Sequence, residues 1–457
     1  MTTSTTLGTN PHSTRIIKTL AFSLLALFYS AWLFIIPPLQ MPDEGAHVIK
    51  GCANLVVDKL PRGYGHKFNG SFVDLSKQAQ VNEVRKKLTP YSHEQFWAKP
   101  IPPSEKEYFY PHAVPNTATV YFLPHLVCRA LNALDTNVQI VFYSMRVATL
   151  ASFLALLVIA YKVNRRFMVS VSPLLMIPMV INQSVAIGAD YFSMAAVILF
   201  GAVMSRPQAE GKPAPWLFAF SLFLMLNVKV VYLPLLILAL PPVIKFRLYR
   251  SLEYIWKTLF LAIPALAMQY YYQTTKTLGA WTSSRTSDQL DLILHQPIDF
   301  FFVLINTLAK TGRHLSVSMF GNVGWLDTPM NSVLAILFPL SLLTYLVGML
   351  YVFRSSIRRN LAAFSIGFGT LIFCIVLVFV SMYLFWSPPA SPIIRGVQGR
   401  YFLPFLFFFV ALIFQSHSQH ETGANPAGLV KLYTGLFFLN TALTTSYLYF
   451  DVLPRYY

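Results

Sequence analysis

Long apolar runs separated by short polar segments recur along the whole chain. The first run, residues 16–36, covers about 20 positions, which is long enough to cross a bilayer as an α-helix. It lacks a small-residue cleavage site, so we expect a retained helix rather than a cleaved signal. Further runs between residues 138 and 451 bring the expected total to about 11 transmembrane helices. The pattern predicts an all-α integral membrane protein with a single membrane-embedded domain over residues 1–457.

Basic residues between the apolar runs predict the orientation of each helix. Loops rich in Lys and Arg usually face the cytoplasm, and the cluster at residues 162–166 is one such loop. Together the clusters indicate a cytoplasmic N-terminus and a C-terminus on the outer side. Residues 38–137 then form a long first outer loop, and residues 276–331 and 387–400 form two further outer loops.

Some segments depart from the simple alternation. Residues 38–115 carry eight of the eighteen acidic residues, which exclude them from the hydrocarbon core. Residues 117–134 are interrupted by proline and charge, and we expect a helix lying at the outer surface. The run 216–243 is too long for one span, so two short spans meeting around Lys229 are expected. Residues 300–308 are predicted to form an amphipathic or re-entrant piece.

The composition also places the chain largely in lipid. Of its 457 residues, 55% are hydrophobic and only 12% are charged, whereas soluble domains carry roughly 25% charged residues. The formal net charge is +17, but the basic residues lie in short clusters rather than along one stripe, so nucleic acid is not an expected partner. The three cysteines show no metal-binding spacing, and no disulfide framework is expected.

The first candidate for chemistry is the segment PDEGAH at residues 42–47, directly after the first apolar run. If Pro42 opens a helix, Asp43 and Glu44 occupy its first turn, where the helix dipole stabilises carboxylates. Asp43 and His47, four residues apart, then share one face. An acid that stays ionised there can accept a proton from a hydroxyl nucleophile.

Two other roles for this segment remain open. Asp43 and Glu44 are also typical of acids that only cap an outer helix. Two carboxylates and the His47 imidazole also suit a divalent cation, Mg²⁺ or Mn²⁺, although the sequence holds no second ligand cluster. The metal requirement is therefore left open, and no cofactor is assigned.

The second candidate is RGVQGRY at residues 395–401, at the outer mouth of a late span. Arg395 and Arg400 flank flexible glycines, and their planar guanidinium groups suit phosphate oxygens. Gln398 and Tyr401 are candidates for substrate binding beside them. The alternative is that Arg400 and Tyr401 are ordinary interfacial anchors.

The third candidate is GNVGWLDTP at residues 321–329, expected on the outer side. Trp325 beside Asp327 is a familiar arrangement for holding a sugar ring, but it is equally typical of an ordered turn. Arg313 adds positive charge nearby. Lys229 lies in an apolar neighbourhood, where an ionisable residue is a functional candidate by default.

Asp190 is a similar case. It lies in a turn, residues 188–190, at which two expected spans form a hairpin. A purely structural role in that turn is an equal alternative.

Missing motifs exclude several functions. The sequence holds no phosphate-cradling Gly-Lys-Ser/Thr loop, no dinucleotide fingerprint and no His-Glu-x-x-His, so nucleotide-driven pumping and the usual zinc protease chemistry have no support. Carboxylates are also sparse within the expected spans, whereas a proton-coupled transporter more often carries them near the middle of the membrane.

Taken together, the motifs resemble a family of bacterial polytopic membrane proteins long described only as a domain of unknown function. The resemblance rests on Pro-Asp-Glu-x-x-His at 42–47, Gly-Trp-Leu-Asp-Thr-Pro at 324–329 and Gly-Val-Gln-Gly-Arg-Tyr-Phe-Leu-Pro at 396–404. Lys229 with Tyr232 and Pro234, and the turn at 188–190, also fit it. That family looks like a branch of the GT-C glycosyltransferases, which take a sugar from a polyprenyl-phosphate carrier at the outer face of the membrane.

The resemblance implies a GT-C-like helical bundle whose first periplasmic loop forms surface helices over the active site. In such enzymes an acid just after the first span is the base or the metal-binding residue, which corresponds here to Asp43, with Glu44 beside it. The expected reaction is a single, inverting displacement at the anomeric carbon. Cations stabilise the phosphate leaving group, and the candidates in order are Arg400, Arg395, Lys229 and Arg313.

The expected partners also follow from the resemblance. The donor is a polyprenyl-phosphate-linked sugar held in membrane lipid, and the acceptor is a surface glycan such as lipopolysaccharide O-antigen, as in serotype conversion. A synthase that charges the carrier lipid and a small flippase complete such a system. The implied location is the bacterial inner membrane with a periplasmic active site. The alternative is a non-enzymatic transporter of a lipid-linked sugar or polysaccharide, for which the outer acids are dispensable.

Overall fold

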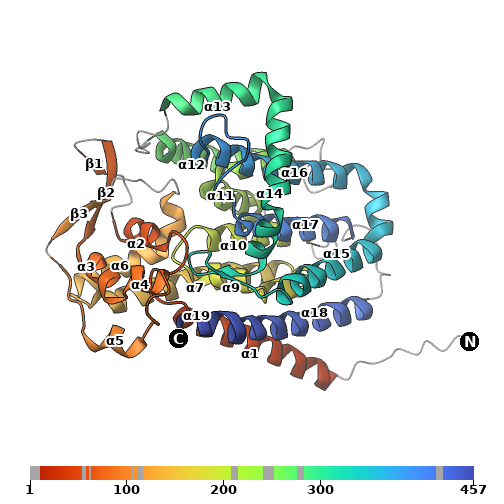
Figure 1. The fold of residues 1–457 in the computed structure, drawn as a ribbon. Helices are drawn as coiled ribbons and strands as arrows, with labels where there is room; N and C mark the ends of the chain where they lie inside the picture. The colour runs from red at the N-terminus through yellow and green to blue at the C-terminus, as the bar shows by residue number, and fades with distance from the viewer. Residues whose placement is uncertain are drawn as a thin grey trace, which may run out of the picture.

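The fold is known from a computed structural model. It describes residues 11–53, 58–60, 63–104, 106–110, 117–206, 215–239, 252–274, 283–417 and 426–457. Apolar helices form a bundle, and most of the first loop gathers at one end of it, on the left in Figure 1. Helix α1 (Pro11–Ile35) ends at that side, and α18 (Pro426–Tyr447) runs to the same side. The first loop and the last residues therefore meet at one end of the bundle.

Most of the bundle is built from predominantly apolar helices, with the more polar α13 among them. These are α7 (Val138–Val163), α8 (Arg165–Leu175), α9 (Pro178–Val185), α10 (Asp190–Met204), α11 (Pro215–Val228), the 3₁₀ segment η3 (Val230–Ala239), α12 (Leu252–Thr274), α13 (Ser283–His295), α14 (Pro297–Phe320), α15 (Leu334–Arg359), α16 (Leu361–Trp386), the 3₁₀ turn η5 (Gly399–Phe402) and α17 (Leu403–His417).

Three helices in the described part of the chain are long and apolar enough to cross a membrane, namely α7, α15 and α16. Two bent helix pairs raise the number to five if each pair is one span. Four shorter apolar helices accompany them. The chain is therefore membrane-embedded, and the total of about 11 crossings stays a prediction.

The two bent pairs have a local cause. Helices α8 and α9 meet at 100°, with Pro173 inside α8 and Pro178 at the first position of α9. Helices α13 and α14 meet at 105°, and Pro297 opens α14. Proline removes a backbone donor and disfavours helix at the residue before it. The sequence pattern predicts a short amphipathic or re-entrant piece at residues 300–308. These residues instead lie within α14, a continuous helix of 24 residues.

A helix break occurs at Lys229, as the sequence predicts. Helix α11 ends at Val228 and η3 begins at Val230. The turn at residues 188–190 also ends where expected, because α10 begins at Asp190. The predicted outer loops 38–137 and 276–331 lie partly outside the described residues.

The first loop is less helical than expected. Its helices are α2 (Glu44–Cys52), α3 (Ser71–Gln78), α4 (Val81–Arg85), α5 (His93–Ala98), the 3₁₀ turn η1 (Ala118–Tyr121) and α6 (Phe122–Ala133). Three short antiparallel strands accompany them in the order β1 (Asp58–Leu60), β2 (Gly63–Asn69) and β3 (Glu107–Tyr110). The strands are three, seven and four residues long, and none has a clear alternation of apolar and polar residues. A second pair, β4 (Asn322–Val323) and β5 (Thr328–Pro329), closes the later turn.

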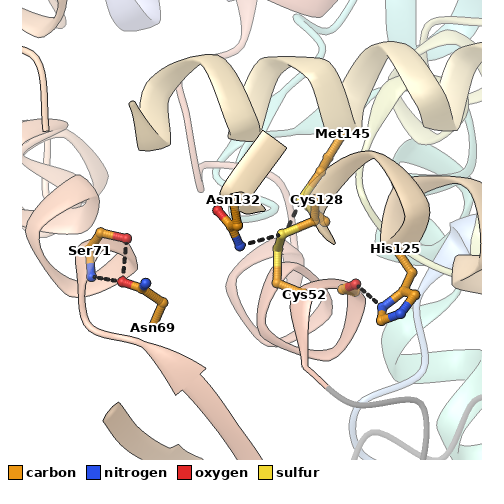
Figure 2. Close-up of a disulfide and its surroundings, with 8 residues drawn as sticks. Cys52, Asn69, Ser71, His125, Cys128, Asn132 and Met145 are labelled. Carbon is orange, nitrogen blue, oxygen red and sulfur yellow. Dashed lines mark hydrogen bonds between the residues drawn. A yellow bond between two sulfur atoms is a disulfide. The ribbon is translucent and has the colours of Figure 1, made fainter. Parts of the chain in front are cut away.

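A disulfide between Cys52 and Cys128 joins the end of α2 to the middle of α6 (Figure 2). Their Cα atoms are 5.5 Å apart. His125 adds a second link, because its Nδ1 lies 3.0 Å from the carbonyl oxygen of Gly51. The expectation of no disulfide was wrong, since the two cysteines are 76 residues apart and nothing in their spacing pairs them.

The last described residues close over the first loop. Helix α18 continues through a π-helical turn, η6 (Leu448–Val452), into α19 (Leu453–Tyr456). The Tyr456 carbonyl accepts a hydrogen bond from the Tyr91 amide at 2.7 Å, and Arg455 donates to the Val84 carbonyl at 2.9 Å. The Tyr457 hydroxyl donates to the Ile35 carbonyl at the end of α1. Segments far apart in sequence are thereby held against one another.

The disulfide can be tested by counting thiols. In the denatured, unreduced protein a maleimide should label one cysteine, Cys374, and after reduction it should label all three. Cys52→Ala should free Cys128 and raise the unreduced count to two. Mass spectrometry gives the counts, and three labelled thiols without reductant would refute the pairing.

Candidate functional site

Asp43 is the first residue of the site, and its carboxylate does not cap a helix. Helix α2 begins at Glu44 rather than at Pro42, and Asp43 precedes it in the left-handed region with φ 63°. Its side chain makes no capping hydrogen bond and is 53% exposed. Non-glycine residues adopt this conformation only where the surroundings fix it. The structure thus turns the Asp43 carboxylate away from its own helix.

Arg400 binds that carboxylate from the far end of the sequence. Its Nη2 lies 2.9 Å from Asp43 Oδ2, and its Nε lies 3.3 Å from Asp190 Oδ2. The Arg400 side chain is only 4% exposed. One guanidinium group therefore bridges the segment after α1 and the start of α10.

Lys229 completes a cluster of four charges. Its Nζ lies 2.7 Å from Asp190 Oδ1 and 4.8 Å from the centre of the Tyr401 ring. The Arg400 guanidinium lies 5.5 Å from the same ring. Two acids and two bases balance, and the Tyr401 ring contacts both cations in the manner of cation–π pairs. We call Asp43, Asp190, Lys229 and Arg400 the four-charge cluster.

The loop that carries Arg400 is held by a close backbone contact. Gly399 lies against α14, where its amide donates to Ser318 Oγ at 2.9 Å. A Cβ added at Gly399 would collide with the α14 backbone at Leu315 and Met319. Gly396 adopts φ 77°, a conformation that favours glycine. The two glycines of the sequence motif therefore fix the path of the loop.

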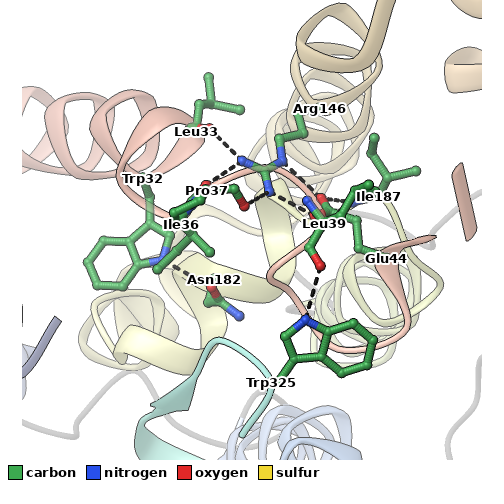
Figure 3. Close-up of polar contacts among 10 residues, drawn as sticks. All are labelled: Trp32, Leu33, Ile36, Pro37, Leu39, Glu44, Arg146, Asn182, Ile187 and Trp325. Atoms are coloured by element: carbon green, nitrogen blue, oxygen red, sulfur yellow. Dashed lines mark hydrogen bonds and ion pairs between the residues drawn. The ribbon is translucent and has the colours of Figure 1, made fainter. Parts of the chain in front are cut away.

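Glu44, the neighbour of Asp43, is engaged elsewhere (Figure 3). Its two carboxylate oxygens accept from Arg146 Nε and Nη2, each at 2.8 Å. Both side chains are fully buried. The remaining Arg146 protons go to the carbonyls of Leu33, Ile36 and Pro37 at 2.7–3.1 Å. These three carbonyl contacts fix the end of α1.

The Glu44 carboxylate also receives backbone amides. The Leu39 amide donates to Oε2 at 3.1 Å, and the Ile187 amide donates to Oε1 at 3.4 Å. Ile187 lies directly before the turn that leads to Asp190. The Glu44–Arg146 pair therefore joins α7, the end of α1, the segment before Asp43 and the turn before Asp190.

His47 lies beside the cluster as a neutral imidazole. Burial is the main cause that lowers its pKa to about 4, against the opposing effect of the Asp43 and Asp190 carboxylates. Its Nδ1 forms a hydrogen bond with the Tyr121 hydroxyl, and its ring lies next to Gly188. At neutral pH it can accept or donate a hydrogen bond but carries no charge.

Trp325 and Asp327 point in different directions. The Trp325 indole donates to the Leu39 carbonyl at 3.1 Å, four residues before Asp43, and Arg85 lies 4.2 Å over its ring. Asp327 pairs instead with Arg455 at 2.7 Å. The turn that carries both is adjacent to the site, but neither side chain joins the four-charge cluster.

The other predicted residues are less closely placed. Arg313 and Arg395 are exposed, and neither side chain forms an ion pair with another described residue. The Gln398 side-chain oxygen is buried, and within the described part of the chain it has no hydrogen-bond partner.

The metal alternative is not supported by the geometry. Both Glu44 oxygens are bound by Arg146, so Glu44 cannot join Asp43 and His47 around one ion. Among the residues that the structure describes, no group of three or more His, Cys, Asp or Glu side chains is suited to hold a metal.

The sequence analysis did not identify Arg146 or Tyr121 as site residues. It gave Asp190 a functional role and a purely structural role in the turn as equal alternatives. Arg146 was overlooked as one charge inside an apolar run, although a lone arginine there is itself a signal of a buried partner. The partner lies 102 residues away, a separation that sequence patterns do not reveal.

The fold and site thus define a membrane-embedded helical protein with a partly exposed charge cluster at the exit of its first helix. The family model described as a predicted membrane protein, DUF2142, matches residues 25–409, and the chain belongs to that family. All four charges of the cluster fall within the match. No curated protein and no solved structure matches the chain.

Loss of Arg146 should destabilise the protein. Arg146→Met leaves the Glu44 carboxylate buried without its partner, which typically costs about 3–5 kcal/mol. Thermal unfolding in detergent measures the loss, and combining it with Glu44→Gln should recover part of it. The exposed Arg354→Met is the control. Equal melting temperatures for the Arg146→Met and Arg354→Met variants would contradict a central role for the Glu44–Arg146 pair.

Gly399→Ala should displace the Arg400 loop from α14. The added methyl group meets backbone atoms that cannot move aside, so we expect a loss of about 1–3 kcal/mol in stability. Gly312→Ala, in the same α14 where a Cβ meets nothing within 4 Å, is the matched control. Melting temperatures in detergent report both. An unchanged melting temperature for Gly399→Ala would mean that Gly399 does not lie close to the α14 backbone.

Proposed function

We propose that this protein is an inverting glycosyltransferase of the GT-C type, which moves a sugar from a polyprenyl-phosphate carrier to a surface glycan on the periplasmic face. The observation that carries the proposal is the pairing of Asp43, half exposed, with Arg400, almost fully buried. A reachable carboxylate beside a fixed guanidinium supplies the two groups that such a transfer needs, a base and a phosphate-binding cation.

The reaction is one displacement. The acceptor hydroxyl attacks the anomeric carbon of the donor sugar, and Asp43 takes the hydroxyl proton. The bond between the anomeric carbon and the phosphate oxygen breaks, and the polyprenyl phosphate leaves with the electron pair. No acid is needed for this leaving group, because Arg400 and Lys229 stabilise its charge. A single displacement inverts the configuration at the anomeric carbon.

The four-charge cluster also explains how donor binding activates the base. Without a donor, Arg400 neutralises Asp43 at 2.9 Å and Lys229 neutralises Asp190 at 2.7 Å. A phosphate brought to Arg400 and Lys229 competes with both carboxylates for these cations. Asp43 then loses its partner and becomes free to accept a proton. The base is therefore active only when the donor is in place.

The remaining residues take supporting roles in this mechanism. Glu44 is a positioning residue, since Arg146 occupies both of its oxygens. His47, as a neutral imidazole next to the cluster, can hydrogen bond to the sugar. Gln398 has a buried oxygen available for a sugar hydroxyl. Arg313 and Arg395 are exposed and suit an approaching lipid phosphate rather than the reacting one.

Several observations support the proposed membrane arrangement. Eleven crossings result if α1, α7, the α8–α9 pair, α10, α11, η3, α12, α15, α16, α17 and α18 each count as one and the bent α13–α14 pair does not cross. The Cys52–Cys128 disulfide suits an oxidising compartment such as the periplasm. The N-terminus would then be cytoplasmic and the site periplasmic, in the bacterial inner membrane.

The acceptor and partners follow the superfamily analogy. We propose a surface polysaccharide such as lipopolysaccharide O-antigen as the acceptor, with a carrier-charging synthase and a flippase as partners in serotype conversion. A transporter of a lipid-linked sugar is the competing class. It predicts that Asp43 is dispensable for function, which separates the two by experiment.

Asp43→Asn should abolish sugar transfer. The amide keeps the shape of the side chain but cannot accept the proton, and loss of a general base typically slows a reaction about 10²–10⁴-fold. Transfer of labelled sugar from membrane polyprenyl-phosphate donor to polysaccharide measures the effect at matched membrane levels. Donor binding should be retained.

Asp74→Asn is the control for charge loss within the same loop, because Asp74 is exposed and pairs only with Lys77 among the described residues. It should transfer at the wild-type rate. Undiminished transfer by Asp43→Asn would remove Asp43 from the mechanism. No transfer by the wild type over several acceptors would favour the transporter.

A further inference from the structure

A second concave surface lies outside the four-charge cluster. It has a volume of about 470 Å³ and is lined by residues 87–90, 327–329, 450, 451 and 454–457. We call it the C-terminal groove. Small-molecule sites in proteins commonly occupy about 300–1,000 Å³, so the groove has the size of a ligand site.

The walls of the groove are held firmly. Arg455 Nη2 pairs with Asp327 Oδ2 at 2.7 Å and donates to the Val84 carbonyl at 2.9 Å. Asp451 Oδ2 accepts from the Asn331 side-chain amide at 2.9 Å. Three segments distant in sequence are therefore fixed relative to one another before any ligand binds, which reduces the entropy cost of binding.

The lining combines aromatic rings with charges of both signs. The Phe450 ring is 65% exposed and Tyr457 is 47% exposed. Asp327 and Asp451 lie near Lys87 and Arg455, so the groove carries no strong net charge. Lys87 is exposed, and within the described part of the chain it forms no ion pair. Apolar ring faces with balanced hydrogen-bonding groups suit a ligand that is rich in hydroxyls and has apolar faces.

The turn at residues 321–329 connects the C-terminal groove to the segment that precedes Asp43. Trp325 donates to the Leu39 carbonyl on the side of Asp43, and Asp327 lines the groove.

From this geometry we propose that the C-terminal groove binds saccharide units of the acceptor glycan, remote from the unit that reacts. The choice of a glycan as ligand rests on the proposed function. Phe450 is the platform for a sugar ring, and Lys87 is the hydrogen-bond donor at the rim. The groove sets which polysaccharide is held, and the four-charge cluster performs the transfer.

Two matched pairs of variants test the groove. Phe450→Ala and Lys87→Gln change its lining, whereas Tyr449→Ala and Lys86→Gln change exposed neighbours that do not line it. The purified protein in detergent is titrated with soluble oligosaccharides released by mild acid from bacterial surface polysaccharide. Saturation-transfer NMR measures binding without any transfer reaction.

We expect Phe450→Ala to weaken binding about tenfold and Lys87→Gln to weaken it about threefold, with both neighbour variants at the wild-type value. Asp43→Asn should bind normally, so a loss of transfer there leaves the groove proposal intact. Wild-type binding in both groove variants would overturn it, and so would the absence of binding by the wild type across all oligosaccharides. Equal losses in Phe450→Ala and Tyr449→Ala would instead indicate aromatic anchors at the lipid interface and would also overturn it.

Discussion

The buried pair of Glu44 and Arg146 is the interaction on which the arrangement of this protein depends. Two opposite charges without any exposure to solvent are tolerated only when their hydrogen bonds are fully met. Here the requirement is satisfied by carbonyls at the end of α1 and by amides before Asp43 and Asp190. Any movement of these segments would leave a charge unpaired in an apolar interior. The catalytic candidate is thus fixed through its immediate neighbour.

The four-charge cluster contrasts with that pair. Asp43 is half exposed and Lys229 is 29% exposed, so water and an anion can reach the cluster. Exposed pairs contribute little to stability and can exchange partners cheaply. Glu44 is therefore fixed in the interior, whereas the adjacent Asp43 can exchange its partner when an anion binds. Neighbouring residues of the same chemical type have opposite physical roles because only one of them faces the bundle.

Local features of this molecule could be predicted from sequence, and long-range pairings could not. Composition and helix-breaking residues predict the apolar helices, the break at Lys229 and the start of α10 at Asp190. The partnership of Asp43 with Arg400 joins residues 357 positions apart, and only the shared family pattern suggested it. The disulfide was missed for the same reason, and the short strands have no readable alternation. Prolines stand at the bends of α8–α9 and α13–α14, but neither bend was predicted from them.

The contacts of residues 455–457 with the first loop can form only late in synthesis. Tyr91 and Val84 are synthesised long before their partners Tyr456 and Arg455, with a separation of up to 371 residues. Until the last segment emerges, the first loop lacks part of its packing, although its disulfide can already form. Premature release of the chain would therefore leave a membrane-inserted but incompletely closed molecule. Removal of residues 455–457 should therefore lower the abundance of the protein.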